Sequence, residues 1–320
     1  MKKKWKTVLG FLLTAALCLT ACGTSSFKDE AVLRIDDREI MKSEYMVYLY
    51  TTTKTFLSAA GEEVWNMDFD GQTADELMEE RTISTIQSVI AAKEYAADNG
   101  IALTEEQKAE AELAAENFIA SVSPDDLKKM GVDAKQIVPM MEDSYLYALV
   151  SQEIAAECEV DAADMADYYQ KNKDLLKEEY TSLKLQSIVT DDAEKAAEAA
   201  DQAKAGEDFA ALFAEYDVDP QAENNGEMML SQKYLQNSFG LSESLEVGDV
   251  AGPLQMGDGY FILKVLEKTV PTEVEVQELA ENIYRTDVQA AYMEARFSEL
   301  TKNQKVEKIE TVWEALEKFH

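Results

Sequence analysis

Few side chains in this chain of 320 residues could make or break covalent bonds. The only histidine, His320, is the last residue. Hydrolases built on a Ser/His/Asp or Cys/His set need an internal imidazole, and so do zinc sites with histidine ligands. Asp68-Phe69-Asp70-Gly71 repeats part of a calcium-binding loop, but the full spacing and the closing glutamate of an EF-hand are missing. The sequence therefore predicts no metal site and no cofactor.

The N-terminus carries the clearest sign of covalent modification. Four lysines among the first six residues precede a mostly apolar run, from Val8 to Thr20, that is too short to span a bilayer of about 30 Å. The run ends in Leu19-Thr20-Ala21-Cys22-Gly23, which resembles the lipobox of bacterial lipoproteins. We therefore expect a signal peptide over residues 1–21, acylation of Cys22 and a lipid-anchored tether over residues 22–29. The alternative is an ordinary signal peptide with an incidental cysteine.

Export and anchoring would place the mature chain on the extracytoplasmic face of the cell membrane. Two acyl chains on Cys22 would give stable anchoring, since each buried CH₂ contributes about 0.8 kcal/mol. Cys18 would leave with the signal peptide, so Cys158 would be the one thiol left and no intramolecular disulfide could form. The helical pattern around Cys158 favours a buried structural thiol over a nucleophile.

The charge balance excludes nucleic acid as a partner. The chain has 30 Lys and Arg residues against 63 Asp and Glu residues, a formal net charge of -33, and such a surface repels a phosphate backbone. Removal of residues 1–21 would take away four lysines and no acids, which lowers the net charge to -37. Hydrophobic residues make up 46% of the chain, enough for a folded core.

The first half of the chain is predicted to be largely helical. Residues 31–35 read as a short strand, followed by a helix that begins near Ser43. From about Leu77 to Glu157 the apolar residues follow helical spacing. Further helix starts are expected at polar capping positions, namely Thr104 with Gln107, Ser123-Pro124, Asp133 and Asp161.

The pattern changes near Tyr180. Alternating apolar residues over 183–189 predict a half-buried strand, and helices are expected after Asp192 and Asp208. Two loops rich in glycine follow, and a hairpin with strands over 254–256 and 260–265 closes this central module. Beyond it we expect a long helix over about 274–301, a short strand over 305–309 and a terminal helix through Trp313.

Five pieces of the central module stand in a recognisable order. They are Gly206–Tyr216, Asp219-Pro220, Asn225-Gly226-Glu227-Met228, Leu245–Val250 followed by Pro253, and Gly259–Val265. In this order and spacing they resemble the second helix, the following loop and the closing strands of the parvulin-type peptidyl-prolyl isomerases, over about residues 181–268. With the lipobox and the helical flanks, the whole chain is similar to the PrsA-like foldase lipoproteins and, more distantly, to SurA-type chaperones.

The resemblance implies an α+β fold with two parts. A parvulin-like (PpiC-type) α/β domain over residues 180–270, with a four-stranded antiparallel sheet flanked by helices, would be inserted into a largely helical, chaperone-like domain. The helical N-terminal domain would cover residues 30–179. Residues 271–320 would add a C-terminal helix and strand that pack back on the N-terminal domain.

One departure from the family pattern concerns the site itself. Parvulins carry one histidine in the first strand and another in the closing strand, and Ser187 and Phe261 take those places here. Asp219 matches a position where the family has Asp or Cys, and Met228 and Phe239 approximate its apolar proline pocket. The resemblance thus implies Asp219 and Ser187 as degenerate catalytic positions, and Met228, Phe239 and Phe261 as substrate-binding ones. Strand packing, a turn role for Asp219 and ordinary core packing are the alternatives.

The resemblance implies a membrane-anchored extracytoplasmic foldase that binds unfolded or secreted client proteins. Prolyl isomerisation must lower a rotational barrier of about 18–20 kcal/mol by favouring a twisted amide. Because Phe261 cannot offer a hydrogen bond to that amide, we expect the isomerase activity to be weak or lost. The alternatives are an active peptidyl-prolyl isomerase that assists folding of secreted proteins and, less favoured, a solute-binding or scaffold lipoprotein.

Overall fold

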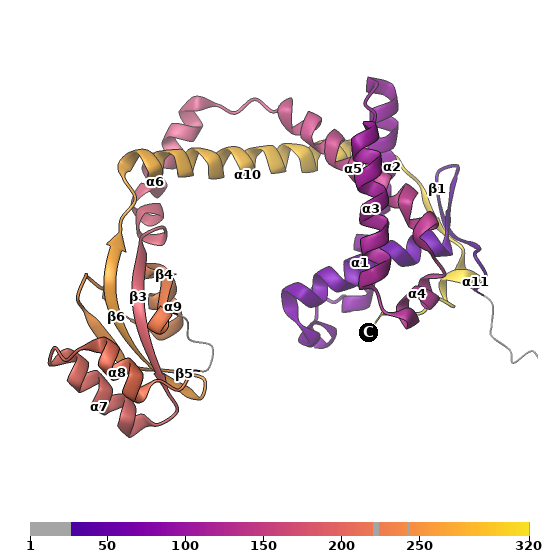
Figure 1. Ribbon diagram of the computed structural model, residues 1–320. Helices are drawn as coiled ribbons and strands as arrows, with labels where there is room; N and C mark the ends of the chain where they lie inside the picture. The colour runs from indigo at the N-terminus through magenta and orange to yellow at the C-terminus, as the bar shows by residue number, and fades with distance from the viewer. Residues whose placement is uncertain (1–26, 220–223, 242, 320) are drawn as a thin grey trace, which may run out of the picture. The chain divides into compact units, whose positions relative to one another are not determined.

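The computed structural model describes residues 27–219, 224–241 and 243–319, so Cys22 and Pro220 lie outside the described residues, as do the predicted signal peptide and most of the tether. The chain forms two compact units (Figure 1). The first contains the residues up to Val150 and those from Phe297, and the second is Ser151–Arg296. The predicted α+β class is confirmed, including a four-stranded antiparallel sheet. Among the described helices, none is long and apolar enough to cross a bilayer.

A small sheet in the first unit joins segments from both ends of the chain. Strands β1 (Ala31–Ile35) and β2 (Arg38–Met41) form a hairpin, and its turn places Asp36 at φ 51°, which aspartate tolerates better than most residues. Strand β7 (Val306–Lys308) pairs with the other side of β1, so the order is β2-β1-β7, all antiparallel. The strands expected over 31–35 and 305–309 are therefore present, whereas β2 was not predicted.

Helices pack against this sheet, and several begin at the predicted caps. Thr104 and Gln107 exchange the two hydrogen bonds of a capping box, and Ser123 accepts a hydrogen bond from the backbone of Asp126. The helices of the first unit are α1 (Lys42–Ala60), α2 (Ala74–Asn99), α3 (Glu105–Ser121), α4 (Pro124–Met130), α5 (Ala134–Ala156), which runs on into the second unit, α11 (Glu310–Trp313) and the 3₁₀ turn η1 (Glu62–Asn66).

The core of the first unit depends on both chain ends. Leu33 and Ile35 of β1 are buried in one cluster with Tyr45 and Met46 of α1. The ring of Trp313, from α11, lies 4.9 Å from the ring of Tyr45. Residues about 270 positions apart therefore close the same core.

The second unit is built around the four-stranded sheet, whose order is β4-β3-β6-β5 with every pair antiparallel. Its strands are β3 (Ser182–Thr190), β4 (Glu227–Ser231), β5 (Val250–Met256) and β6 (Gly259–Thr269). Its helices are α6 (Ala162–Glu179), α7 (Ala193–Lys204), α8 (Phe209–Tyr216), the turn η2 (Asn224–Gly226), α9 (Gln232–Phe239) and α10 (Glu273–Thr301), which continues into the first unit.

The two faces of this sheet have separate hydrophobic clusters. Ile188 and Ile262 face α7 and α8, where they are buried among four alanines of α7 and Phe209 of α8. The opposite face carries Leu185 and Leu263 and is covered in part by α9 (Figure 1). The alternating residues over 183–189, which predicted a strand, therefore point to opposite faces of the sheet, and both faces are packed.

Helix α9 was not predicted, and part of α10 packs within the second unit. Residues 232–239, to which the sequence analysis assigned no helix or strand, form α9. It is capped by the Ser231 hydroxyl, which accepts a hydrogen bond from the backbone of Tyr234 at 3.0 Å. The part of α10 that belongs to the second unit packs on α6, where Leu176, Val276 and Ala280 are buried together.

Candidate functional site

The predicted site residues Ser187 and Phe261 lie on neighbouring strands and on the same face of the sheet. Ser187 of β3 pairs with Leu263 of β6, and Val189 pairs with Phe261. Residues two positions apart on a strand point to the same face, so Ser187 and Phe261 are diagonal neighbours, with Cα atoms roughly 7–8 Å apart. The pairing of the two strands therefore places residues 187 and 261 near each other on one face of the sheet.

Phe261 belongs to an aromatic and aliphatic cluster on this face. Its ring lies 5.5 Å from the ring of Phe239 with an interplanar angle of 67°, close to an edge-to-face contact. Met228 and Leu254 pack into the same cluster as partly buried residues. The three predicted substrate-binding residues Met228, Phe239 and Phe261 are thus brought together, and we call them, with Leu254, the apolar face.

Ser187 is almost completely enclosed beside this apolar face. Its exposed fraction is 2%, and its Oγ has no hydrogen-bond partner among the described residues. The turn at Asn225 and Gly226 lies close to the strand, since Gln186 Nε2 donates to the Asn225 carbonyl at 3.0 Å. A Cβ on Gly226 would lie 2.2 Å from the Ser187 carbonyl oxygen. Only glycine fits there, and a buried hydroxyl without a partner is unusual.

Asp219 is positioned by a second aspartate that the sequence analysis did not single out. The Asp217 carboxylate accepts hydrogen bonds from the backbone N–H of Val189 at 2.8 Å and of Asp219 at 3.2 Å. The N–H of Val218 donates to the Val189 carbonyl at 2.9 Å, which ties the loop after α8 to the end of β3. Burial raises the pKa of the Asp217 carboxyl, and the backbone donors partly offset this effect. Its place at the end of α8, two residues before Asp219, was the available sequence signal.

The second unit offers little for covalent or metal chemistry. Cys158 is partly buried, and its Sγ lies 3.9 Å from the Val288 carbonyl of α10. Among the described residues, no group of three or more His, Cys, Asp or Glu side chains could hold a metal ion.

A separate groove lies between α1 and α3 in the first unit. It has a volume of about 600 Å³, and the rings of Tyr50 and Phe118 in its lining are 6.0 Å apart at 87°. The remaining lining consists of one lysine, Lys54, and small or hydroxylated residues: Thr51, Thr55, Ser58, Ala59 and Ser121. We call it the α1–α3 groove.

Comparison with known proteins identifies the module that carries the apolar face. Residues 160–281 match the family model of the PPIC-type PPIASE domain. The matched residues are called the parvulin-type domain below. The matched range begins just before Asp161, the N-cap of α6, and ends within α10, so the parvulin-type domain falls inside the second unit.

Relatives of the whole chain are similar to it at low identity. The foldase protein PrsA of Caldanaerobacter subterraneus is 20% identical, with 93% of this chain and 94% of the relative covered. The foldase protein PrsA of Halalkalibacterium halodurans is 25% identical, with 86% and 76% covered. A solved structure of PrsA from Streptococcus pneumoniae, 14% identical, covers 85% of this chain and 93% of its own, with a TM-score of 0.45. The predicted resemblance to parvulin-type isomerases and PrsA-like foldases is confirmed.

Proposed function

We propose that this chain is a membrane-anchored, extracytoplasmic foldase that holds unfolded or secreted polypeptides, and that its parvulin-type domain has weak or no isomerase activity. The observation that carries the proposal is the contact of Phe261 with Phe239 beside the buried, unpartnered hydroxyl of Ser187. Similarity to PrsA foldases over most of the chain supports the foldase role.

The chemistry of amide rotation explains the expected loss of activity. An isomerase must stabilise the twisted amide more strongly than the planar one, and polar groups next to the amide contribute to this difference. Phe261 has no polar atom to contribute. Ser187 has a hydroxyl, but its exposed fraction of 2% keeps it from reaching a bound chain without rearrangement. The site therefore retains an apolar surface without the groups that act on the rotating bond.

Binding of clients requires apolar surface that adapts to many sequences. Met228 belongs to the apolar face, and methionine fits irregular partners because its side chain is flexible and polarizable. The α1–α3 groove adds a second surface with Tyr50 and Phe118. We propose that the groove holds extended client segments in the first unit, with the apolar face as a further contact in the parvulin-type domain.

The proposal includes the organisation of the chain. Residues 1–21 would be removed as a signal peptide, and Cys22 would carry the lipid at the start of a tether over residues 22–29. The helical domain would comprise residues 30–179, completed by residues 271–320, with the parvulin-type domain over residues 180–270 inserted between them. Metabolic labelling with a fatty acid, in cells that carry Cys22 or Cys22→Ser, tests the anchor.

The client-holding role is tested with a matched pair of variants in α1. Ala59 lines the α1–α3 groove, whereas its neighbour Ala60 does not, and both are exposed. Ala59→Arg would obstruct the groove, and Ala60→Arg would add the same charge and bulk outside it. We expect Ala59→Arg to lose most of the suppression of aggregation of an unfolding client, and Ala60→Arg to retain it. Equal suppression by both variants would show that the groove does not hold clients.

The match to an isomerase domain gives one specific reason to keep the active-enzyme alternative. Refolding of a client limited by proline isomerisation separates the two. A holding protein raises the yield of refolded client and leaves the rate of the slow phase unchanged. An active isomerase increases that rate in proportion to its concentration.

A further inference from the structure

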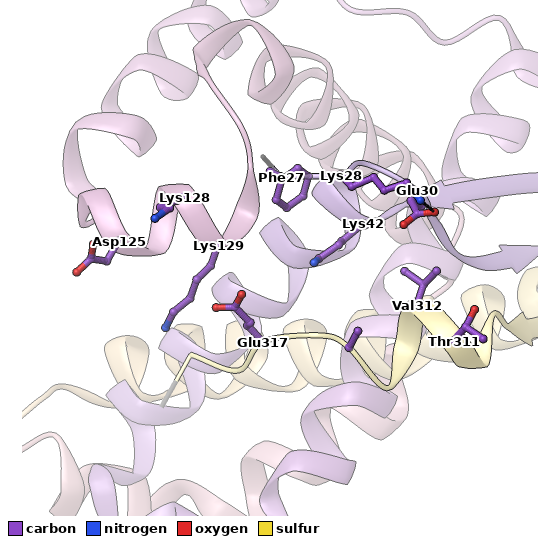
Figure 2. A pocket seen from close by; sticks show the side chains of 11 residues that line it. Phe27, Lys28, Glu30, Lys42, Asp125, Lys128, Lys129, Thr311, Val312 and Glu317 are labelled. Carbon is purple, nitrogen blue, oxygen red and sulfur yellow. Dashed lines mark hydrogen bonds and ion pairs between the residues drawn. The ribbon is translucent and has the colours of Figure 1, made fainter. Parts of the chain in front are cut away.

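Four lysines line one cavity in the first unit. The cavity has a volume of about 750 Å³ and is formed by the segment that begins at Phe27, the start of α1, helix α4 and the segment around and after α11 (Figure 2). Its lysines are Lys28, Lys42, Lys128 and Lys129. We call this cavity the lysine pocket.

The lysine pocket reverses the charge balance of the chain. Three acids, Glu30, Asp125 and Glu317, also line it, so cations outnumber acids four to three there. Across the chain, 63 acids outnumber 30 cations by about two to one. Glu30 is already paired with Lys28 at 2.5 Å. The lining is therefore much more favourable to an anion than the surface of this acidic protein as a whole.

Two of these lysines have no ion pair within the described part of the chain, namely Lys42 and Lys128. The ammonium group of Lys42 lies 5.1 Å from the centre of the Phe27 ring, and that of Lys129 lies 5.5 Å from the centre of the Phe319 ring. Lys129 also lies 3.5 Å from Asp126. The aromatic rings hold two ammonium groups in place, and Lys42 and Lys128 keep their charge available for a ligand.

The pocket also lies close to the proposed anchor. The ring of Phe27 rests on Gly131 so closely that a Cβ at residue 131 would lie 2.3 Å from it. This contact fixes the position of Phe27 on the first unit. Cys22 is five residues before Phe27, and five residues reach at most about 18 Å. A lipid on Cys22 would thus hold the lysine pocket near the surface of the membrane.

We propose that the lysine pocket binds the phosphate of an anionic phospholipid head group, an inference that rests on the proposed anchorage at Cys22. An anionic membrane repels the body of the protein, whose charge is strongly negative, and attracts the surface where cations prevail. Phe27 and Val312 add apolar lining beside the lysines, which suits an amphiphilic ligand. Occupation of the pocket would orient the first unit on the membrane that carries it.

Vesicle binding by a chain without a lipid tests this proposal. The chain used starts at residue 22 and carries Cys22→Ser, so it keeps every described residue. We expect it to bind vesicles of phosphatidylglycerol mixed with phosphatidylcholine and not vesicles of phosphatidylcholine alone. Lys42→Gln with Lys128→Gln should weaken binding by about fivefold per lysine, or roughly 25-fold.

Lys135→Gln with Lys305→Gln is the matched control, because it removes two charges from exposed lysines of the same unit that do not line the pocket. Equal weakening by both pairs would overturn the proposal, as would the absence of binding or of a preference for phosphatidylglycerol. Inorganic phosphate that binds as tightly as the vesicles would assign the pocket to a free anion instead. Because no lipid anchor is present, these results do not depend on whether Cys22 is acylated in cells.

Discussion

The ring of Phe261 lies 5.5 Å from the ring of Phe239, so a residue of the last strand of the parvulin-type domain packs on a residue of α9. The two residues lie 22 positions apart in the sequence and belong to the hydrophobic cluster on one face of the sheet. A phenyl ring at residue 261, diagonal to Ser187 across the two strands, offers no hydrogen bond. Under the proposed function, this contact is one reason why the domain would bind a polypeptide without catalysing rotation of its amide bonds.

Replacing both departures from the family pattern should restore isomerase chemistry. Ser187→His with Phe261→His puts two imidazoles on the same face of neighbouring strands. We expect catalysed isomerisation of an Xaa-Pro peptide to rise at least tenfold above wild type, an increase worth about 1.4 kcal/mol in the barrier. Ser187→Ala with Phe261→Leu changes the same positions without polar groups and should leave the rate at the wild-type level. A similar rise in the isomerisation rate of both double variants would show that the imidazoles are not its cause.

Gly131 should tolerate a side chain less well than Gly100, although both have φ +68° at the end of a helix. Alanine at either position costs about 1 kcal/mol because the left-handed conformation is strained. At residue 131 the added Cβ also collides with the ring of Phe27, whereas nothing lies within 4 Å of a Cβ at residue 100. We therefore expect Gly131→Ala to lower the free energy of unfolding more than Gly100→Ala.

The variant Phe27→Ala separates strain from collision in this comparison. In its background, Gly131→Ala should cost no more than Gly100→Ala, because the ring that meets the Cβ is gone. Chemical denaturation followed by circular dichroism measures the free energy of unfolding for Gly131→Ala and Gly100→Ala, each with and without Phe27→Ala. An excess cost at residue 131 that persists without the ring would show that Phe27 does not rest on this glycine.

Glu44 should make a contribution to stability that falls as pH rises. Burial raises the pKa of its carboxyl above the usual 4.5, although the Arg38 guanidinium, 2.8 Å away, partly offsets the effect. The folded chain then binds this proton more tightly than the unfolded chain, so stability is lost between pH 4.5 and the raised value. Glu44→Gln cannot titrate. The free energy of unfolding of wild type minus that of Glu44→Gln should therefore decrease over this window.

The contribution of Glu76 to the free energy of unfolding should change with pH in the opposite direction. Hydrogen bonds from the backbone and side chain of Thr73 lower the pKa of its carboxyl below 4.5. Its contribution is present above pH 4.5 and is lost as pH falls through the lowered value. The difference between wild type and Glu76→Gln should thus increase with pH. If the two differences changed with pH in the same direction, the environments assigned to Glu44 and Glu76 would be contradicted.

Trp313 should matter for the first unit even though it is near the end of the chain. Its ring lies 4.9 Å from that of Tyr45, and the Lys308 ammonium lies 3.8 Å from its centre. We expect Trp313→Ala to lower the free energy of unfolding by about 2–3 kcal/mol. Tyr234→Ala, which removes an aromatic ring that is 45% exposed, should cost less than about 0.5 kcal/mol. Similar losses in the two variants would argue against a core closed by the C-terminal segment.

The sequence predicted the strands that hold the site because their signal is local. Alternation over residues 183–189 and the turn at Gly257 are properties of consecutive residues. The register of β3 against β6 is not a local property, and Ser187 and Phe261 were assigned to one site from the resemblance to parvulin-type isomerases. Helix α9 could not be predicted, because its eight residues are mostly polar and carry too few apolar positions to show a helical period.

Tertiary contacts account for the rest of what was missed. The role of Asp217 depends on the backbone of Val189, which lies 28 residues earlier, and no local pattern shows that contact. The enclosure of the Ser187 hydroxyl depends on how closely the turn at Gly226 approaches β3. The lysine pocket joins the N-terminal segment, α4 and the C-terminal segment, so its charge could not be read from any one stretch of sequence.

The most direct test is the cis/trans exchange rate of a short Xaa-Pro peptide, measured by magnetisation transfer with and without the wild-type protein. It decides whether the parvulin-type domain binds a polypeptide without catalysing isomerisation of its Xaa-Pro bonds. A site with Phe261 packed on Phe239 and an enclosed Ser187 hydroxyl predicts an exchange rate within about twofold of the uncatalysed rate, which is slow because the barrier is about 18–20 kcal/mol. Acceleration by a hundredfold or more at protein concentrations well below that of the peptide would contradict it.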